Sequence, residues 1–463
     1  MKHNGSHAND HGAPGGSSAP LHYVIVGNGA AGASAAETIR AHDAHSRITI
    51  LTAEPSLMYS RPGLAYVATG EIPPRQVIAR RAEWYEQLRL GLVYDAAERL
   101  DVVAQRVYLS NGDSLPYDKL LIATGARAAA PPYPDATLKG VVYLDTLEGT
   151  KELLRQARRG RKGVVIGGGI TALEMVEGFL HRNVETHYFV RGDQLWGRVF
   201  NDTESALLEA SMKAHGVHIH YRTEAEEILP TRWGHKVRAA RLKGGGAFSC
   251  QLFGVAIGVT PSLELVRGTP LKLDRGILVN EYLETSVPHV FAAGDCAQVY
   301  DPWTRRHMLD VLWPSAVAEG QAAAMNMMGR RQPYEKGTPF NVCKLFGLHV
   351  TIIGQINPRS VGDEEPEIVQ HLSRGASETW FTRPRTHVSA WAQDGPNTLR
   401  LVMDEDKLVG AMLIGEQTLA DALRLLIQDE VDIFAIRPAL QAGGDEMRRA
   451  LLRFWHAYQR QVG

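Results

Sequence analysis

The feature that most constrains this chain is a strand, a glycine-rich turn and a helix that occur in this order twice. In the first copy, the apolar run HYVIVG (22–27) enters the turn GNGAAG and continues into the Ala-rich segment ASAAETIRAHD (33–43). In the second, GVVIGGG (163–169) leads into ITALEMVEGFLHRN (170–183). A further apolar strand follows each copy, so each predicts a βαβ unit with parallel strands and a right-handed crossover. Because the copies lie about 140 residues apart, they predict two related domains rather than a repeat array.

The first turn fits the pattern G-x-G-x-x-G of dinucleotide-binding sites. Gly27 allows a tight turn away from the strand, Gly29 lets the backbone approach a pyrophosphate, and Gly32 lets the helix pack closely on the strand. The free N–H groups and the dipole at the helix N-terminus then favour phosphate. Glu54 ends the following strand, where its carboxylate can accept hydrogen bonds from a ribose. The alternative for Glu54 is a surface residue in the turn before Pro55.

Length and composition set the broad class of protein. With 463 residues, the chain is too long for one core and predicts two to four domains. Its apolar fraction of 44% and charged fraction of 22% are ordinary for globular proteins. Its formal net charge of −1 gives no field that would attract nucleic acid or an anionic membrane. The sequence predicts neither a membrane span nor a signal peptide, and we expect a cytoplasmic protein.

Residues 1–20 differ from the rest of the chain. They are rich in Gly, Ser, Asn, Pro and His, with almost nothing to bury, and they predict a disordered leader. Within them His3, His7 and His11 recur every four residues. This spacing could hold a metal ion, but a solvated tail is the better interpretation.

Further matches extend beyond the first turn and carry a family resemblance. They are Ser60–Arg61–Pro62, Ala123–Thr124–Gly125 at the end of a strand, Gly294–Asp295 at the end of another, and WPSAVAEGQAAAMN (313–326). Together with the glycine turns they resemble the flavoproteins with two dinucleotide-binding domains. The branch most similar contains ferredoxin and rubredoxin reductases, NADH oxidases and the FAD-binding part of assimilatory nitrite reductases. The resemblance covers about residues 21–463.

The resemblance implies that FAD binds at the first turn. Arg61 and Pro62 would lie along the isoalloxazine, and Asp295 would hold the ribityl chain, although it could also be a simple turn residue. Amides at the helix N-terminus near Trp313–Ser315 would stabilise negative charge on the reduced flavin. The implied FAD contacts are Gly27, Gly29, Ala30, Ala31, Gly32, Glu54, Arg61, Pro62, Ala123, Thr124, Gly125, Gly294, Asp295, Trp313 and Ser315.

The second turn, GGGITA (167–172), fits the variant G-x-G-x-x-A, and the resemblance makes it the NAD(P)H site. The strand after it ends in Val190 and Arg191, where proteins that prefer NAD place an acid. A guanidinium can bind a 2′-phosphate, so the sequence favours NADPH over NADH. In the alternative, Arg191 and Arg198 are solvated surface charges. The expected contacts are Gly167, Gly169, Ile170, Thr171, Ala172, Glu174, Arg191 and Gly258.

The resemblance also pairs Arg61 with Glu174 next to flavin N5. Such a charged pair would steady N5 and control the access of the nicotinamide. Because a guanidinium does not deprotonate at working pH, we expect positioning and electrostatics from Arg61 rather than proton delivery. A structural ion pair without effect on hydride transfer is the alternative. Because stacked rings exchange hydride directly, the sequence nominates no general acid or base.

The cysteines argue against two kinds of redox chemistry. Cys250, Cys296 and Cys343 lie far apart, without a CxxC or CxxxxC motif, so we expect three packed thiols in a reducing compartment. In the resembling family, disulfide-reducing branches carry a cysteine near Ser60–Arg61–Pro62 or in a CxxxxC motif on the first long helix, and this chain has neither. Reduction of disulfides, coenzyme A disulfides or peroxide is therefore disfavoured. No cysteine cluster could hold an iron–sulfur centre.

The expected fold class is α/β, with two Rossmann-like domains and a C-terminal α+β domain. Behind the leader, we expect a discontinuous FAD-binding domain (21–145 and 276–332), an NAD(P)-binding domain (146–275) and a C-terminal interface domain (333–463). In the last, LRLVMDEDKLVGAMLIG (399–415) predicts a β-hairpin, and an amphipathic helix follows it.

The C-terminal domain would cover the flavin or form the contact of a homodimer. Its aromatic residues Trp380, Phe381, Trp391 and Trp455 could lie in the core or in an interface, and core is the commoner case.

Three functions compete. The leading hypothesis is an FAD-dependent oxidoreductase that takes hydride from NAD(P)H and passes electrons to a protein acceptor, such as ferredoxin, rubredoxin, another small iron–sulfur protein or a companion reductase subunit. The second is an oxidase or reductase of a small acceptor such as oxygen, quinone or nitrite. The third is a flavin-binding structural or regulatory subunit, which only the missing acid at Val190 supports. No resident metal and no nucleic-acid partner are expected.

Overall fold

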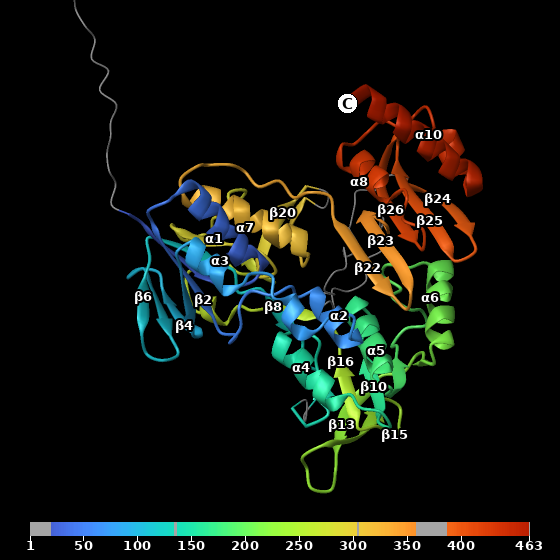
Figure 1. The fold of residues 1–463 in the computed structure, drawn as a ribbon, viewed down its shortest axis with the longest axis horizontal. Helices are drawn as coiled ribbons and strands as arrows, with labels where there is room; N and C mark the ends of the chain where they lie inside the picture. The colour runs from blue at the N-terminus through green and yellow to red at the C-terminus, as the bar shows by residue number, and fades with distance from the viewer. Residues whose placement is uncertain (1–19, 134–136, 303–304, 358–386, 463) are drawn as a thin grey trace, which may run out of the picture.

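The computed structural model describes residues 20–133, 137–302, 305–357 and 387–462. These residues form three parts, each built on a sheet of its own (Figure 1). The predicted leader lies outside the described residues, except for Pro20. The two parallel sheets and the antiparallel C-terminal sheet confirm the predicted α/β class with two Rossmann-like sheets.

The first sheet has five parallel strands in the order β19-β7-β1-β2-β3. Its central strand is almost wholly apolar and buried, as expected for a strand covered on both faces. One edge strand comes from far along the chain, because residues 290–292 pair with residues 120–122. The strands are β1 (His22–Val26), β2 (Arg47–Thr52), β3 (Leu90–Tyr94), β7 (Lys119–Ile122) and β19 (Val290–Ala292).

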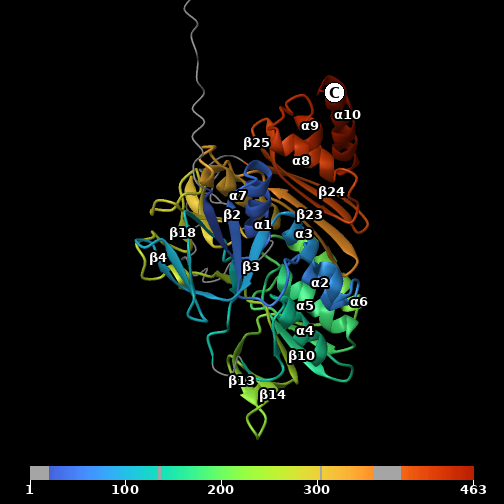
Figure 2. The same cartoon turned by 60° about the vertical axis from the view of Figure 1, so that its left-hand side comes forward.

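Two helices lie side by side on the first sheet, α1 (Ala30–His42) and α7 (Trp313–Met327) (Figures 1 and 2). They approach so closely that a Cβ atom at Gly320 would collide with the carbonyl oxygen of Ala31. The remaining elements of this part are α3 (Ala82–Gln87), a 3-10 turn at Glu264–Val266, the three-stranded sheet β4 (Ala97–Asp101), β5 (Arg106–Leu109) and β6 (Ser114–Pro116), and the three-stranded sheet β18 (Ile277–Leu278), β20 (Ala297–Asp301) and β21 (Arg306–Leu309). Helix α2 (Gly63–Thr69) and the 3-10 turn at Pro74–Val77 also come from this stretch of the chain, but the buried side chains of α2 pack against the second part.

The second sheet repeats the first, with the strand before the glycine turn again in the centre. Its order is β12-β11-β10-β16-β9, and all four pairings are parallel. The strands are β9 (Val141–Val142), β10 (Lys162–Ile166), β11 (Glu185–Phe189), β12 (His218–His220) and β16 (Leu252–Val255). Two short antiparallel strands, β8 (Ala126–Ala128) and β17 (Val259–Pro261), join the two parts where the chain crosses between them.

The two faces of the second sheet are covered by different elements. One face packs against the helices α4 (Leu147–Gln156), α5 (Ile170–His181) and α6 (Asp202–Ala214). Apolar side chains of the other face pack against an antiparallel meander, β13 (Ala225–Pro230), β14 (Val237–Leu242) and β15 (Ala247–Ser249). Both covers exclude water from the sheet, which explains its continuous apolar strands.

The C-terminal part is an antiparallel sheet in the order β22-β23-β26-β25-β24, with helices packed against it (Figure 1). The predicted hairpin over 399–415 is confirmed, with Asp404 opposite Lys407 at its turn, and the predicted amphipathic helix is α8. The elements are β22 (Phe340–Leu345), β23 (Leu348–Gly354), β24 (His387–Asp394), β25 (Asn397–Asp404), β26 (Lys407–Ile414), α8 (Ala420–Gln428), α9 (Arg437–Ala442) and α10 (Gly444–Val462).

The aromatic residues singled out in this part divide between described and undescribed positions. Trp391 and Trp455 are half-buried, and Trp455 packs against the core of the C-terminal part. Trp380 and Phe381 lie outside the described residues. Of the helices within the described ranges, not one combines the length and the apolar character that a membrane span needs.

Candidate cofactor-binding site

A cavity of about 200 Å³ lies where the three parts meet. Its wall is formed by the N-terminal ends of three helices, α1, α5 and α7, together with α2 and strand β22. Predicted site residues from both glycine turns therefore face one space. Those in the wall are Gly29, Ala30, Ala31, Arg61, Pro62, Ala123, Gly125, Ile170, Thr171, Glu174, Gly294, Asp295 and Trp313.

The first glycine turn combines two tight backbone approaches with one open position. At Gly27 (φ +121°) a Cβ atom would collide with the carbonyl oxygen of Ala123, and at Gly32 it would collide with the carbonyl oxygen of Gly27. At Gly29, by contrast, a Cβ atom would meet nothing within 4 Å. The chain packs against itself at the outer glycines and leaves room for a ligand at the middle one.

The helix that follows begins without a cap. Gly29 is its N-cap and makes no side-chain hydrogen bond, and the first turn carries no acid. Its first N–H groups and positive dipole end are thus available to an anion at the cavity. Side-chain caps are present at α4, where Thr146 accepts a hydrogen bond from Gly149, and at α6, where Asn201 forms a capping box with Glu204, whereas the helices at 63–69, 82–87, 420–428 and 437–442 also lack one. What fits a pyrophosphate at α1 is the position of its open N-terminus, because Gly29, Ala30 and Ala31 lie in the cavity wall.

The second glycine turn has the same construction. Gly167 (φ +141°) lies so close to the carbonyl oxygen of Ala256 that a Cβ atom would collide with it, and its own carbonyl accepts a hydrogen bond of 2.9 Å from the hydroxyl of Tyr188. Helix α5 begins after Gly169, again without a side-chain cap and without an acid in its first turn. Two uncapped helices of this kind fit two dinucleotides.

The third uncapped helix, α7, starts at Trp313 behind Leu312. Ser315 lies one turn in, but its hydroxyl donates to Asp310 at 2.9 Å and it is not in the cavity wall. Trp313 is in the wall. The role of the backbone N–H groups at this helix end stays a prediction, and the Ser315 side chain serves the neighbouring loop.

Gly294–Asp295 is held in place from behind. The buried carboxylate of Glu319, on α7, accepts a hydrogen bond of 2.7 Å from the backbone N–H of Gly294. Gly294 has φ +79°, a left-handed conformation that glycine adopts without strain. Asp295 then lies half-buried in the wall. Burial raises the pKa of Glu319 well above its usual value, with Asp310 contributing further.

Arg61 joins the first part to the linker that leads into the second. Its guanidinium contacts the carboxylate of Glu54 at 2.6 Å and donates to the carbonyl oxygen of Asp145 at 2.6 Å. The hydroxyl of Tyr59 donates to the same Glu54 carboxylate at 2.6 Å. Arg61 thus contacts Glu54 and Asp145, and Glu174 lies in the wall of the same cavity. A functional pair of Arg61 and Glu174 stays a prediction.

Four more predicted residues lie behind the wall or beside it. Glu54 is half-buried and engaged as described, so its role at a ribose stays a prediction. The hydroxyl of Thr124 donates to the carbonyl oxygen of Ser262 at 2.8 Å and thereby joins the two parts. Gly258 lines a smaller pocket that it shares with Thr171. Ala172 is fully buried under the second turn.

Sequence reasoning missed the contribution of strand β22 to the cavity. Cys343 and Lys344 lie in the wall, and Lys344 is 3.9 Å from Glu71 on the opposite side. Burial raises the pKa of the Cys343 thiol, and Glu174 and Glu177 raise it further. A thiol in that state is a poor nucleophile. No local motif marks these residues, because the strand reaches the site only through the packing of the C-terminal part.

The three cysteines are free and buried, as predicted for packed thiols. Cys296 lies next to Asp295, yet its Sγ atom is 3.5 Å from the carbonyl oxygens of Ile122 and Ala293 and does not reach the cavity wall.

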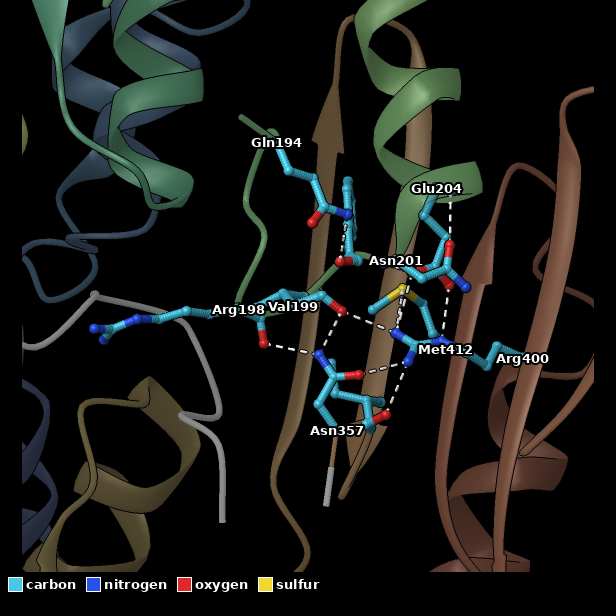
Figure 3. A network of polar contacts seen from close by, with 10 residues as sticks. Gln194, Arg198, Val199, Asn201, Glu204, Asn357, Arg400 and Met412 are labelled. Atoms are coloured by element: carbon cyan, nitrogen blue, oxygen red, sulfur yellow. Dashed lines mark hydrogen bonds and ion pairs between the residues drawn. The ribbon is translucent and has the colours of Figure 1, made fainter. Parts of the chain in front are cut away.

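Arg191 is exposed at the end of β11, directly after the buried Val190. The loop that follows is fixed by the C-terminal part: Arg400 donates to the carbonyl oxygen of Val199 at 2.8 Å, and Asn357 donates to that of Arg198 at 2.8 Å. Figure 3 shows the side chain of Arg198 directed away from this network. Arg191 and Arg198 therefore both have exposed side chains, on a loop whose backbone is held by the C-terminal part.

Comparisons with known proteins agree with this geometry. The family model described as pyridine nucleotide-disulphide oxidoreductase matches residues 21–320. The chain is 27% identical to an NAD(P)H nitrite reductase of Bacillus subtilis (strain 168) over 92% of the chain and 50% of that protein, so it spans half of that relative's length.

A second curated relative is the ferredoxin–NAD(+) reductase component of the anthranilate 1,2-dioxygenase system of Burkholderia cepacia. It is 33% identical over 67% of the chain and 77% of that protein. Among solved structures, the covalent complex of putidaredoxin reductase with putidaredoxin matches with a TM-score of 0.78 and 22% identity, covering 90% of this chain and 94% of that one. At that identity the match shows the fold.

Proposed function

We propose a function from the premise that the chain belongs to the pyridine nucleotide-disulphide oxidoreductase family. It is an oxidoreductase that binds FAD and a nicotinamide dinucleotide. We infer that it passes electrons from the nicotinamide through the flavin to a separate protein acceptor, a small iron–sulfur protein or a companion reductase subunit. The observation that carries the proposal is the meeting of three uncapped helix N-termini at one cavity.

The residues of the wall divide the work of binding. The amides after Gly29 would hold the pyrophosphate of FAD, Asp295 would hold its ribityl chain, and the amides near Trp313 would face its negatively charged edge. When bound, the flavin accepts a hydride from the nicotinamide and releases electrons to an acceptor. Helix α5 would hold the second pyrophosphate, which brings both ligands to the same cavity.

The chain's own side chains would position the rings rather than move protons. Arg61 is tied to Glu54 and to the backbone of Asp145, so it can fix the angle between the first part and the linker. The thiol of Cys343 is held neutral by its raised pKa. These features favour electron transfer to an outside acceptor over chemistry on a thiol of this chain.

For the nicotinamide we propose NADPH. The end of β11 carries the exposed Arg191 where an acid would favour NADH. A homodimer and a cytoplasmic location, both expected from the sequence, stay predictions.

The test is anaerobic stopped-flow mixing of the purified yellow protein with NADPH or NADH. We expect rapid bleaching of the flavin band and turnover only after a purified iron–sulfur protein is added. Steady turnover with oxygen alone would instead make the chain an oxidase. A flavin band that neither nicotinamide bleaches would contradict the proposal and favour a structural flavin-binding subunit.

A further inference from the structure

Four side chains able to bind a metal gather on the second sheet. Glu185 and His187 alternate on β11, and His218 and His220 alternate on the neighbouring β12. Side chains two residues apart on a strand point to the same face, and the parallel register places His187 beside His218. The patterns E-x-H and H-x-H thus bring one carboxylate and three imidazoles together, and we call these four residues the histidine cluster.

The members of the histidine cluster are in direct contact. Nε2 of His187 lies 3.1 Å from Oε1 of Glu185, and Nδ1 of His187 lies 2.9 Å from Nε2 of His220. The rings of His187 and His218 stack with their centroids 4.6 Å apart. One ligand atom each from Glu185, His187 and His218 lies within 4.8 Å of the other two. Zinc–ligand bonds are about 2.0–2.2 Å long, and stacked rings do not direct their nitrogens at one point, so the exposed His218 ring would turn to close this set around one ion.

The surroundings of the histidine cluster hold the side chain of His187 in place and leave those of Glu185 and His218 room to rotate. His187 is buried at 7% exposure, with the ring of Phe248 4.6 Å away, whereas Glu185 and His218 are exposed. Lys162 contacts Glu185 at 2.8 Å through Oε1, the atom that also faces His187. An ion bound at Glu185 would share this carboxylate with Lys162.

We propose that Glu185, His187 and His218 bind a divalent transition-metal ion of the zinc type, with water completing its coordination. Imidazole and carboxylate are the ligands that zinc takes from proteins, and three of them suffice when a water occupies the fourth position. His220 would hold the second ring nitrogen of His187, as the outer partners of metal-bound histidines do.

The histidine cluster is separate from the cofactor cavity, because none of its four residues is in the cavity wall. The ion would therefore be structural. It would tie the short strand β12, which pairs with β11 at the edge of the second sheet, to the body of that sheet. A bound ion of this kind raises the melting temperature in proportion to the logarithm of its free concentration.

The experiment measures zinc in the flavin-containing protein after equilibrium dialysis against buffered zinc chloride, by mass spectrometry of the metal. All samples carry alanine in place of His3, His7 and His11, so that the leader cannot contribute to zinc binding. We expect one zinc ion per chain, and a melting temperature that rises with zinc. X-ray absorption at the zinc edge should report imidazole nitrogen and oxygen neighbours.

Three variants locate the site. His218→Ala and Glu185→Gln change exposed ligands, so the fold is kept, and each should abolish zinc binding and the zinc-dependent rise in melting temperature. His220→Gln should weaken zinc binding about tenfold or more. The matched control is His235→Ala, an exposed histidine between β13 and β14, which should leave zinc binding unchanged.

Absence of bound zinc in the parent protein would overturn the proposal, and so would zinc binding that survives both His218→Ala and Glu185→Gln. Flavin reduction by the nicotinamide should stay at its original rate in His218→Ala. A failure of the metal site is therefore distinguishable from a failure of the proposed electron transfer.

Discussion

The guanidinium of Arg400, on β25 of the C-terminal part, holds the carboxylate of Glu204, in the first turn of α6, through two contacts of 3.0 and 3.1 Å (Figure 3). Both side chains are buried, at 7% and 0% exposure. The same guanidinium donates to Val199 and Asn357, so one side chain anchors the loop behind β11 to another part of the molecule. Burial raises the pKa of Glu204, and Arg400 opposes that rise.

Replacing Arg400 should therefore cost much stability. Arg400→Met leaves a carboxylate buried without its cation, and we expect the free energy of unfolding to fall by about 3–5 kcal/mol. Adding Glu204→Gln to this variant should recover part of the loss, because a neutral amide is cheaper to bury. Chemical denaturation of the two single variants and the double variant gives the coupling energy. If the losses in the free energy of unfolding of the two single variants add up to the loss of the double variant, the two side chains have no coupling energy.

The glycines of the first turn should respond in opposite ways to alanine. Gly32→Ala places a Cβ atom against the carbonyl oxygen of Gly27, so we expect a loss of more than about 4 kcal/mol or no folded protein. Gly29→Ala meets open space and should fold, but its methyl group would occupy the position of the phosphates. Thermal melts and the ratio of bound FAD to protein separate the two outcomes. A Gly29→Ala protein with full FAD content would contradict this assignment.

Arg61 should matter for rate as well as for stability. Arg61→Ala removes the contacts with Glu54 and Asp145, and a small change in the angle between the parts would slow flavin reduction by roughly 10- to 100-fold. Arg61→Lys keeps the charge but cannot make both contacts, so we expect an intermediate rate. Stopped-flow reduction by the nicotinamide is the measurement. A changed melting temperature with an unchanged rate would identify a purely structural ion pair.

Glu319 should make stability depend on pH. Its pKa in the folded protein is raised above the ordinary value of 4.5 by burial and by Asp310. The stabilisation is therefore complete below about pH 4.5 and is lost as the pH rises through the raised value, by at most about 1.4 kcal/mol per pH unit. Glu319→Gln still accepts the hydrogen bond from Gly294 without this titration. Its stability relative to the parent should increase with pH in denaturation series, and a constant difference would refute the argument.

Arg191 should set the choice of nicotinamide. Arg191→Ala removes a charge-assisted hydrogen bond to a 2′-phosphate, worth about 1.5–3 kcal/mol, so KM for NADPH should rise at least roughly tenfold while KM for NADH stays the same. Arg198→Ala is the companion variant, because Arg198 is exposed on the same loop. Steady-state kinetics with NADPH and with NADH measures the KM values of both variants. Equal effects of Arg191→Ala on both would show that the residue does not read the 2′ position.

The sequence allowed prediction of features that depend on neighbouring residues. The two glycine turns, their strands and helices, and the hairpin at Asp404 all follow from local backbone requirements, and the structure has them. The packed state of Cys296 was also predictable, because it belongs to a buried strand exit. In each case the deciding contacts lie within a few residues or within one strand pairing.

Features that depend on distant packing were not predictable. Arg61 reaches Asp145, which is 84 positions away, and no local pattern indicates that contact. Cys343 enters the cavity wall only because the C-terminal part rests against the second part, where Phe346 donates a backbone hydrogen bond of 3.0 Å to Glu177. The histidine cluster was not predicted either, because it depends on the pairing of β11 with β12, which lie about 30 positions apart in the sequence.

Strand β19 of the first sheet is synthesised late, and this has a consequence for folding on the ribosome. Strand β7 can pair with β19 only after residues 290–292 have been made, and every strand of the second sheet is made before them. On the ribosome, the second sheet can therefore complete while the first still has an open edge at β7, which is a site for wrong pairing. Translation speed and chaperones near that stage would decide how much of the chain reaches its final state.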